Sequence, residues 1–426
     1  MGGEGRDGRF GQMSDQRDLV GAAGEPEELG FAPARLRRID DHFAKYVDDG
    51  RLAGWQVAVS RGGKVVHAST CGHRDTAAGG PFQHDTIVRL YSMTKAITSV
   101  AAMMLYEEGA FELKDPVAKF IPSFADMRVF SGGSSAKPTT EPAREPMRIW
   151  HLLTHTSGLT YGFHYSHPVD ALYRAAGFDF GMPPGVDLAD VCERWSTLPL
   201  LFEPGSRWNY SVATDVLGRI VEIVSGMSLD EFFRTRIFEP LGMTDTAFHV
   251  DEGKVDRFAV LYSPHPKTGK AFVSPLDKPL TTPPAALSGG GGLTGTTKDY
   301  LRFVHMLRGR GEFEGVRLLG TRTVDYMTRN HLPGGQDLEQ FGIQQFAETT
   351  YEGVGFGLGF SVVDDPVKNR VLGSTGDFGW GGAASTTFWV DPVNDIAVVF
   401  LTQLLPSSTH PIRSELKRLV LQALID

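Results

Sequence analysis

The chain has only two cysteines, Cys71 and Cys192, among its 426 residues. Two cysteines cannot build a disulfide framework or an all-cysteine zinc site, and we expect both to be buried free thiols. The sequence also lacks the run of about 18 apolar residues that a membrane-spanning helix needs. Its first twenty residues carry charges of both signs and no apolar segment typical of a signal peptide. These absences predict a cytoplasmic protein without a membrane partner.

An excess of positive charge is missing as well. The 42 Lys and Arg residues are outnumbered by 51 Asp and Glu residues, which gives a net charge of −9. This balance does not favour nucleic acid as the main partner. Histidines such as His164 and His167 have no metal-ligand spacing with acidic residues, so we assign no metal and no cofactor. The hydrophobic fraction of 41% is nevertheless typical of a globular protein with a substantial core.

Helix and strand patterns recur at both ends of the chain. A helical pattern around residues 36–47 is followed by a hairpin pattern over residues 55–69, while a second hairpin over residues 386–402 precedes a final helix near residues 412–424. The simplest packing joins both ends in one antiparallel sheet with the terminal helices on one face. The predicted fold class is therefore α/β, of the α+β type.

The middle of the chain differs from its ends in composition and in its predicted secondary structure. Residues 126–148 are rich in Gly, Ser, Pro and charge and are predicted to form a long loop, and four helical patterns follow between residues 149 and 237. We expect a mainly helical domain, residues 116–245, inserted into a discontinuous α/β domain, residues 29–115 and 246–426. Residues 1–28 are predicted to form a flexible tail.

Several common catalytic motifs are absent. The chain has no G-x-S-x-G, no H-E-x-x-H and no P-loop. The glycine-rich run at residues 289–295 lacks the preceding apolar strand and the following helix of a nucleotide site, so it does not favour phosphate binding. What remains is S-x-x-K, at Ser92, Ser134 and Ser414.

Only the first S-x-x-K motif has the context that its chemistry needs. The serine must sit at a helix start, near free backbone N–H groups, with the lysine one turn later on the same face. Ser92 and Lys95 open a helical pattern that ends near Gly109. Ser134 lies in a Gly/Ser/Pro-rich segment, and Ser414 lies inside a charged amphipathic helix. Ser92 is therefore the candidate nucleophile.

The residues from Ser92 to Lys95 resemble the nucleophile motif of the serine β-lactamase and penicillin-binding-protein superfamily. Residues 150–159 (WHLLTHTSGL) resemble a signature that follows the nucleophile helix, and residues 202–205, 208–211 and 240–243 resemble the segment that carries the catalytic tyrosine. The resemblance covers roughly residues 30–420. The branch that it indicates is the family VIII carboxylesterases, which are similar to class C β-lactamases.

The resemblance gives Tyr210 the role of the catalytic tyrosine. A free phenol is a poor base at neutral pH, but an adjacent ammonium such as that of Lys95 favours the phenolate form. The pair could then share the proton of Ser92. The sequence leaves open which of Lys95 and Tyr210 acts as the base at each step.

The third family motif is usually Lys-Thr-Gly on a late strand. The literal string at residues 267–269 is flanked by prolines and is predicted to be a hairpin tip. Trp380, Gly381, Gly382 and Ala383 precede the C-terminal hairpin and fit the position of the motif. By resemblance, the backbone N–H groups of Ser92 and Ala383 would form the oxyanion hole.

Two departures from the family pattern shape the predicted substrate. Trp380 replaces the lysine that helps to hold a substrate carboxylate, and Val212 stands where the Tyr-x-Asn motif has asparagine. Both changes put apolar surface in place of polar recognition. They favour a serine carboxylesterase acting on neutral short- to medium-chain esters. Five aromatic residues are candidates for lining its acyl pocket: Tyr161, Phe163, Tyr165, Phe178 and Phe180.

Other functions remain open at this point. The same serine acylation leaves weak hydrolysis of β-lactams open, and a β-lactamase or D,D-peptidase is an alternative. An acyltransferase, in which an alcohol outcompetes water, is a second alternative. A non-catalytic binding protein on the same fold is a third, although the joint presence of Ser92, Lys95 and Tyr210 argues against it.

Overall fold

The computed structural model describes residue 19 and residues 23–343 and 351–426. Its centre is an eight-stranded antiparallel sheet in the order β12-β13-β14-β15-β16-β1-β2-β3. Strand β1 pairs with β16, with Val57 opposite Phe400, so the two ends of the chain share one sheet as predicted. The strands are β1 (Gly54–Arg61), β2 (Lys64–Asp75), β3 (Gly80–Pro81), β12 (Val354–Phe356), β13 (Ser361–Val363), β14 (Phe378–Gly381), β15 (Thr387–Asp391) and β16 (Ile396–Thr402).

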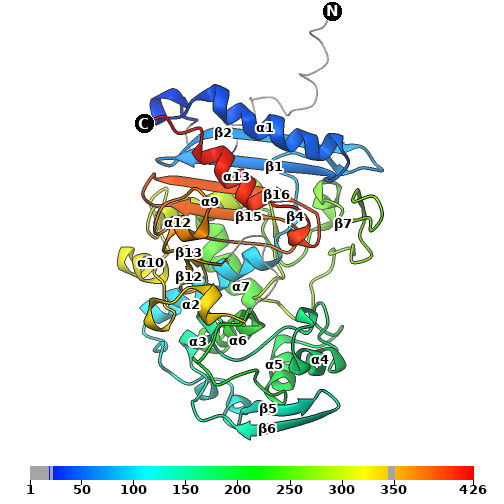
Figure 1. Cartoon of the computed structure of the whole chain (residues 1–426), viewed down its shortest axis with the longest axis vertical. Coiled ribbons are helices and arrows are strands. Elements are labelled where there is room, and N and C mark those ends of the chain that lie inside the picture. The colour runs from blue at the N-terminus through cyan, green and yellow to red at the C-terminus, as the bar shows by residue number, and fades with distance from the viewer. Residues whose placement is uncertain (1–18, 20–22, 344–350) are drawn as a thin grey trace, which may run out of the picture.

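The two terminal helices cover one face of this sheet. Helices α1 (Pro33–Asp48) and α13 (Ile412–Leu421) pack against each other (Figure 1). The side chains of Val57 and Val59 join their apolar cluster, whereas Ala58 faces the opposite cluster. This alternation follows from the two-residue repeat of a strand. Helix α9 (Thr297–Arg308) packs on β16 from the opposite side.

A group of helices lies below the sheet in Figure 1 and ends at the β5–β6 hairpin. Helix α2 (Thr94–Glu107) packs against α6 in its interior, and all residues from 94 to 105 are buried. This burial explains why α2 is apolar on nearly every side. The other helices here are α3 (Ile149–Leu153), α4 (Pro168–Ala175), α5 (Leu188–Ser196), α6 (Ala213–Ser225), α7 (Leu229–Phe233) and α8 (Glu239–Leu241), with a π-helical turn at Arg234–Phe238.

Two expectations are corrected in this region. The predicted long loop at residues 126–148 contains a hairpin of β5 (Arg128–Ser134) and β6 (Lys137–Pro142). Most of its side chains are exposed, so the strands lack the apolar alternation that would have revealed them. Helix α4 was not predicted. It begins at Pro168 with its N-terminus capped by His167 and Asp170.

The predicted tail, residues 1–28, lies mostly outside the described residues. Its described part packs on the domain. Leu19 is buried, and the Gly24 N–H donates to the Val65 carbonyl at 3.0 Å. Residues 23–28 are therefore not a free tail.

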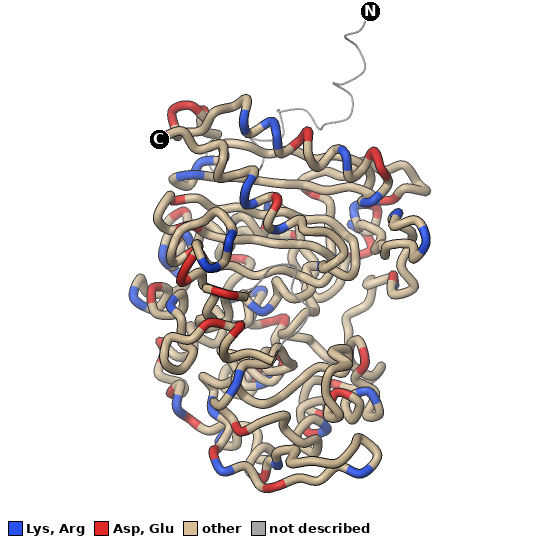
Figure 2. The backbone as a smooth tube through the Cα atoms, viewed as in Figure 1, with Lys and Arg blue, Asp and Glu red and all other residues tan. Residues whose placement is uncertain are grey.

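Short elements complete the described chain. They are the paired strands β4 (Val88–Arg89) and β9 (Thr294–Gly295), β7 (Tyr262–Pro264) and β8 (Ala271–Val273), β10 (Glu312–Phe313) and β11 (Val316–Arg317), and the helices α10 (Thr321–Met327), α11 (Leu338–Phe341) and α12 (Pro366–Asn369). Both cysteines are buried free thiols, as expected. Lys and Arg are interspersed with Asp and Glu over the molecule (Figure 2). Among the described residues, no helix is long and apolar enough to cross a membrane.

Candidate active site

Ser92 lies on a 3-10 turn, Tyr91–Met93, that leads directly into α2. Its predecessor Tyr91 has a φ of 46°, in the left-handed region that favours glycine. Strained backbone of this kind concentrates at functional sites. Lys95, in the first turn of α2, is only 2% exposed and directs its Nζ to the Ser92 Oγ at 3.4 Å. The structure thus brings together the two ends of the predicted S-x-x-K motif.

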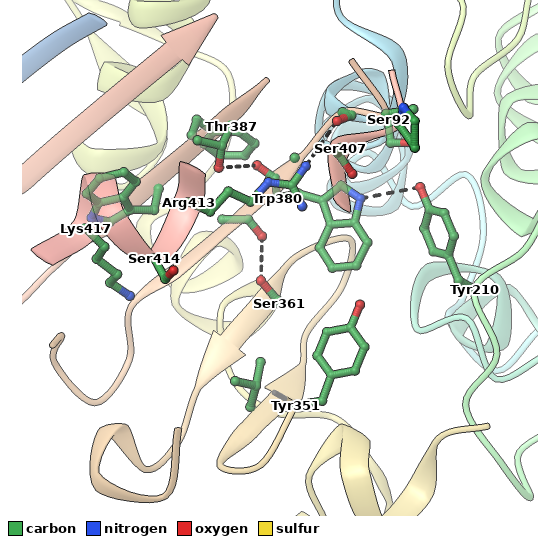
Figure 3. A pocket seen from close by; sticks show the side chains of 18 of the residues that line it. Ser92, Tyr210, Tyr351, Ser361, Trp380, Thr387, Ser407, Arg413, Ser414 and Lys417 are labelled. Atoms are coloured by element: carbon green, nitrogen blue, oxygen red, sulfur yellow. Dashed lines mark hydrogen bonds between the residues drawn. The ribbon is translucent and has the colours of Figure 1, made fainter. Parts of the chain in front are cut away.

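Tyr210 precedes α6 and approaches the same lysine from across the site. Lys95 Nζ lies 4.6 Å from the centroid of the Tyr210 ring and 5.4 Å from that of Tyr161. The indole Nε1 of Trp380 donates to the Tyr210 hydroxyl at 3.4 Å (Figure 3). The phenol therefore contacts both the nucleophile helix and the third predicted motif.

The segment at residues 150–159 supports Tyr210. It contains His155, whose ring centroid lies 4.9 Å from that of Tyr210 and whose Nδ1 is 3.2 Å from the Ser211 hydroxyl. The His155 carbonyl accepts the Asn209 N–H at 2.9 Å. Burial, with the charge of Lys95, holds the pKa of His155 well below its ordinary value. A neutral imidazole thus packs against Tyr210 and holds its loop.

The third motif forms the opposite wall. Trp380 and Gly381 end strand β14, and Gly382 approaches the turn before Ser92 so closely that an added Cβ would lie 2.3 Å from the Leu90 carbonyl. The Gly382 N–H donates to Thr386, whereas the Ala383 N–H has no hydrogen-bond partner in the described part of the chain. That free donor lines the same cavity as Ser92. An unpaired backbone N–H beside the Ser92 hydroxyl is the kind of donor that the predicted oxyanion hole needs.

Ser92 and Ala383 lie where two cavities meet. One has a volume of about 560 Å³ and is lined by Trp208, Tyr210 and Trp380. The other has a volume of about 580 Å³ and contains Val212 in its wall. The five aromatic residues at positions 161, 163, 165, 178 and 180 each line one or both cavities.

The other two S-x-x-K motifs and the literal Lys-Thr-Gly string do not form a second site of this kind. Ser134 and Lys137 pair at the tip of the β5–β6 hairpin. Lys267 to Gly269 form the tip of the β7–β8 hairpin, as predicted. Ser414 lies on α13, where its hydroxyl donates to the Pro411 carbonyl, although it also lines the cavity of about 560 Å³. No group of three or more His, Cys, Asp or Glu that could hold a metal occurs in the described ranges.

Sequence reasoning missed three residues that support this site. Gly290 accepts a hydrogen bond from Lys95 Nζ through its carbonyl at 2.5 Å, and Asp215 accepts the Gly290 N–H at 2.9 Å. Arg413, on α13, donates to the Gly382 carbonyl at 3.0 Å. An acidic residue among the buried residues at the start of α6 was the available signal for Asp215. The other two contacts join segments far apart in the chain.

Comparison with known proteins identifies the family of the chain. The Beta-lactamase family model matches residues 39–422. Esterase EstB of Burkholderia gladioli is 31% identical over 409 residues, 90% of this chain and 94% of EstB. Protein Rv1367c of Mycobacterium tuberculosis is 39% identical over 362 residues, 84% of this chain and 88% of that protein. The solved structure of EstCE1, "a hydrolase with promiscuous acyltransferase activity", superposes with a TM-score of 0.76 at 27% identity, covering 93% of this chain and 99% of EstCE1.

The fold and the site thus define a serine hydrolase of the β-lactamase and penicillin-binding-protein superfamily. The chain belongs to the Beta-lactamase family. Within it, the esterase relatives group the chain with the family VIII carboxylesterases, which confirms the resemblance inferred from the motifs.

Proposed function

We propose that the chain is a serine carboxylesterase that hydrolyses neutral short- to medium-chain esters by way of an acyl-enzyme on Ser92. The observation that carries this proposal is the convergence of Ser92, Lys95 and Tyr210 beside the Ala383 N–H. The similarity to EstB and EstCE1 supports an ester as the substrate class.

The proposed reaction has two steps. The Ser92 Oγ attacks the ester carbonyl carbon while its proton passes to the Lys95–Tyr210 pair. The N–H groups of Ser92 and Ala383 stabilise the oxyanion, each donor contributing about 2.7–4 kcal/mol to the barrier reduction. The alcohol leaves with the proton from the pair. Water then attacks the acyl group, returns a proton through the pair to Ser92, and releases the acid.

The walls of the two cavities support a neutral substrate. Trp380 and Val212 present apolar surface where the family pattern has a lysine and an asparagine. A carboxylate entering such a site would lose hydration without the charged partner that other family members offer. We therefore expect esters to react much faster than peptides or β-lactams.

Acyl transfer is the second candidate function, and one observation favours it. Ser92 stands at the junction of two cavities of similar volume, about 560 and 580 Å³. One cavity can hold the acyl group while the other holds an alcohol. An alcohol bound there would compete with water for the acyl-enzyme, in line with the promiscuous acyltransferase activity of EstCE1.

The test is hydrolysis of p-nitrophenyl butyrate by the wild type, Ser92→Ala and Ser134→Ala. Ser134 belongs to a second S-x-x-K motif on a remote hairpin and serves as the matched control. We expect activity to fall by several orders of magnitude only in Ser92→Ala, and a fluorophosphonate to label Ser92. Equal activity in all three proteins would exclude Ser92 as the nucleophile. Added butanol separates the two candidates, because butyl butyrate forms only if acyl transfer occurs.

A further inference from the structure

The glycine-rich segment at residues 288–292 is wedged between helices α2 and α6. On the α2 side, the Thr98 hydroxyl donates to the Gly289 carbonyl at 2.7 Å. The Leu293 N–H donates to the Thr94 hydroxyl at 3.1 Å. The segment is thus fixed to the helix that carries Lys95.

Asp215 holds the segment from the α6 side. Its Oδ1 accepts the Ser288 hydroxyl at 2.5 Å and the Gly290 N–H at 2.9 Å. Its side chain is almost completely buried. A Cβ at position 290 would lie 2.4 Å from Asp215 Oδ2, so only glycine fits there without a shift.

One residue, Gly290, therefore links the buried acid to the buried ammonium through its two consecutive peptide groups. The N–H of Gly290 points to the Asp215 carboxylate, and its carbonyl accepts Lys95 Nζ at 2.5 Å. The 289–290 peptide group turns the positive end of its dipole to the anion, and the 290–291 peptide group turns the negative end of its dipole to the cation, so both interactions are favourable. Burial strengthens them because little water screens the charges.

We propose that Asp215 is the counter-ion and positioning residue of Lys95, acting through the backbone of Gly290. The inference rests on the proposed function, in which Lys95 exchanges protons with Ser92. Asp215 fixes the Lys95 amine within reach of the serine and favours the protonated form of the Lys95–Tyr210 pair. The glycine run, which has no phosphate-site context, serves here as the clamp between them.

The other titratable groups around Lys95 do not take this role. The ring of Tyr161 and that of Tyr210 face the ammonium at 5.4 and 4.6 Å. Burial holds the pKa of His155 well below its ordinary value and lowers that of His164 to about 4, so both histidines are neutral at neutral pH. They add no charge that could balance the cation.

Asp215 is itself affected by this environment. Burial raises the pKa of the Asp215 carboxyl, while the Lys95 charge, the Ser288 hydroxyl and the Gly290 N–H act in the opposite direction. The pH range of the test should therefore extend from weakly acidic to alkaline values, where the carboxyl is ionised.

The experiment compares Asp215→Asn with Asp299→Asn. Asp299 is a matched control because it is also a buried third residue of a helix, α9, that accepts one backbone N–H and one hydroxyl. The asparagine oxygen at position 215 can still accept from Gly290, so this variant removes the charge and keeps the clamp. The pH dependence of kcat/KM for p-nitrophenyl butyrate is measured together with the melting temperature.

In Asp215→Asn, we expect the midpoint of the acidic limb to move to lower pH by about one unit. The reason is that a proton on the Lys95–Tyr210 pair is less stable without the nearby negative charge. Asp299→Asn should keep the wild-type midpoint even if its melting temperature falls. An unchanged midpoint in Asp215→Asn would overturn the inference.

Two further measurements distinguish a failure of this inference from misfolding of Asp215→Asn and from a failure of the proposed function. If Asp215→Asn does not fold, Gly290→Ala tests the same link, and its plateau activity should fall about tenfold or more because the carbonyl must move. Gly253→Ala is its control, since an added methyl there meets no atom within 4 Å. Wild-type activity in Gly290→Ala would also overturn the inference. Failure of a fluorophosphonate to label Ser92 in the wild type would instead refute the proposed function.

Discussion

The indole Nε1 of Trp380 donates a hydrogen bond to the hydroxyl of Tyr210 at 3.4 Å. The two rings also pack against each other, with centroids 5.4 Å apart. Trp380 is predicted to occupy the position where the family pattern has a lysine, so in the proposed site a neutral donor takes over part of what an ammonium would do. In the proposed mechanism, the indole orients the Tyr210 phenol without attracting an anionic substrate.

Removing this donor should weaken catalysis modestly. Trp380→Phe keeps an aromatic ring and loses the hydrogen bond, whose net value is about 0.5–1.5 kcal/mol. We expect kcat/KM for p-nitrophenyl butyrate to fall about two- to tenfold. Trp389→Phe is the control, because the Trp389 Nε1 is buried without a hydrogen-bond partner in the described structure. Equal losses in both variants would show that indole packing, rather than the bond to Tyr210, matters.

Tyr210→Phe should be far more damaging. It removes the hydroxyl that shares the Ser92 proton, and a general acid–base group typically contributes about 10²–10⁴-fold to the rate. The ring contacts with His155 and Tyr161 remain, so the melting temperature should change little. Steady-state kcat and a thermal melt measure the two effects. Tyr351→Phe, in a second phenol lining the same cavity, is the control, and a wild-type kcat in Tyr210→Phe would refute the role.

The sequence predicted those parts of the fold that are encoded locally. The hairpins of β1–β2 and β15–β16 are rich in apolar residues because both faces of the sheet are buried there, and the terminal helices carry an apolar stripe that packs on one of those faces. The β5–β6 hairpin was missed since its strands are largely exposed on both faces. An apolar sequence pattern arises where side chains are buried, so a hairpin exposed to solvent has almost no such pattern.

In the site, too, the sequence reveals contacts between residues that are close along the chain and not contacts between distant segments. Ser92 and Lys95 are three residues apart, so one helical turn brings them together and the motif reveals them. The link from Asp215 to Lys95 runs through Gly290, which is 195 residues from the lysine. Spacing along the chain cannot reveal a contact of this kind. The hydrogen bond from Arg413 to Gly382 was missed for the same reason.

The close packing of Gly382 makes it a sensitive position. A Cβ there would lie 2.3 Å from both the Leu90 carbonyl and the Thr386 hydroxyl, so the strand must shift. The shift would displace the neighbouring Ala383 N–H from the oxyanion, and losing one such donor costs about 10²–10³-fold in kcat. We expect Gly382→Ala to lose kcat on this scale with a smaller change in KM. Gly253→Ala should match the wild type, and a Gly382→Ala enzyme with normal kcat would exclude Ala383 as an oxyanion donor.

Buried histidines predict that acid destabilises the fold. Burial lowers the pKa of His84 and His151 to about 4 and that of His305 to about 3. The unfolded chain binds protons at these sites near pH 6.5, so their stabilisation is complete above that pH and is lost as the pH falls toward 4. Asp299 and Asp377 act oppositely. Burial raises the pKa of each to about 6, so their contribution is present at low pH and lost as the pH rises through 6.

The histidine shifts are the larger ones, and we expect the melting temperature to fall between pH 6.5 and 4. Between pH 6.5 and 4, the loss in free energy of unfolding should be about 3 kcal/mol smaller in His305→Gln than in the wild type, at roughly 1.4 kcal/mol per pK unit. The reason is that glutamine binds no proton. His73→Gln, at an exposed position, should leave the slope unchanged. Chemical unfolding at a series of pH values measures both. A slope in His305→Gln equal to that of the wild type would mean that His305 binds its proton as readily in the folded chain as in the unfolded one.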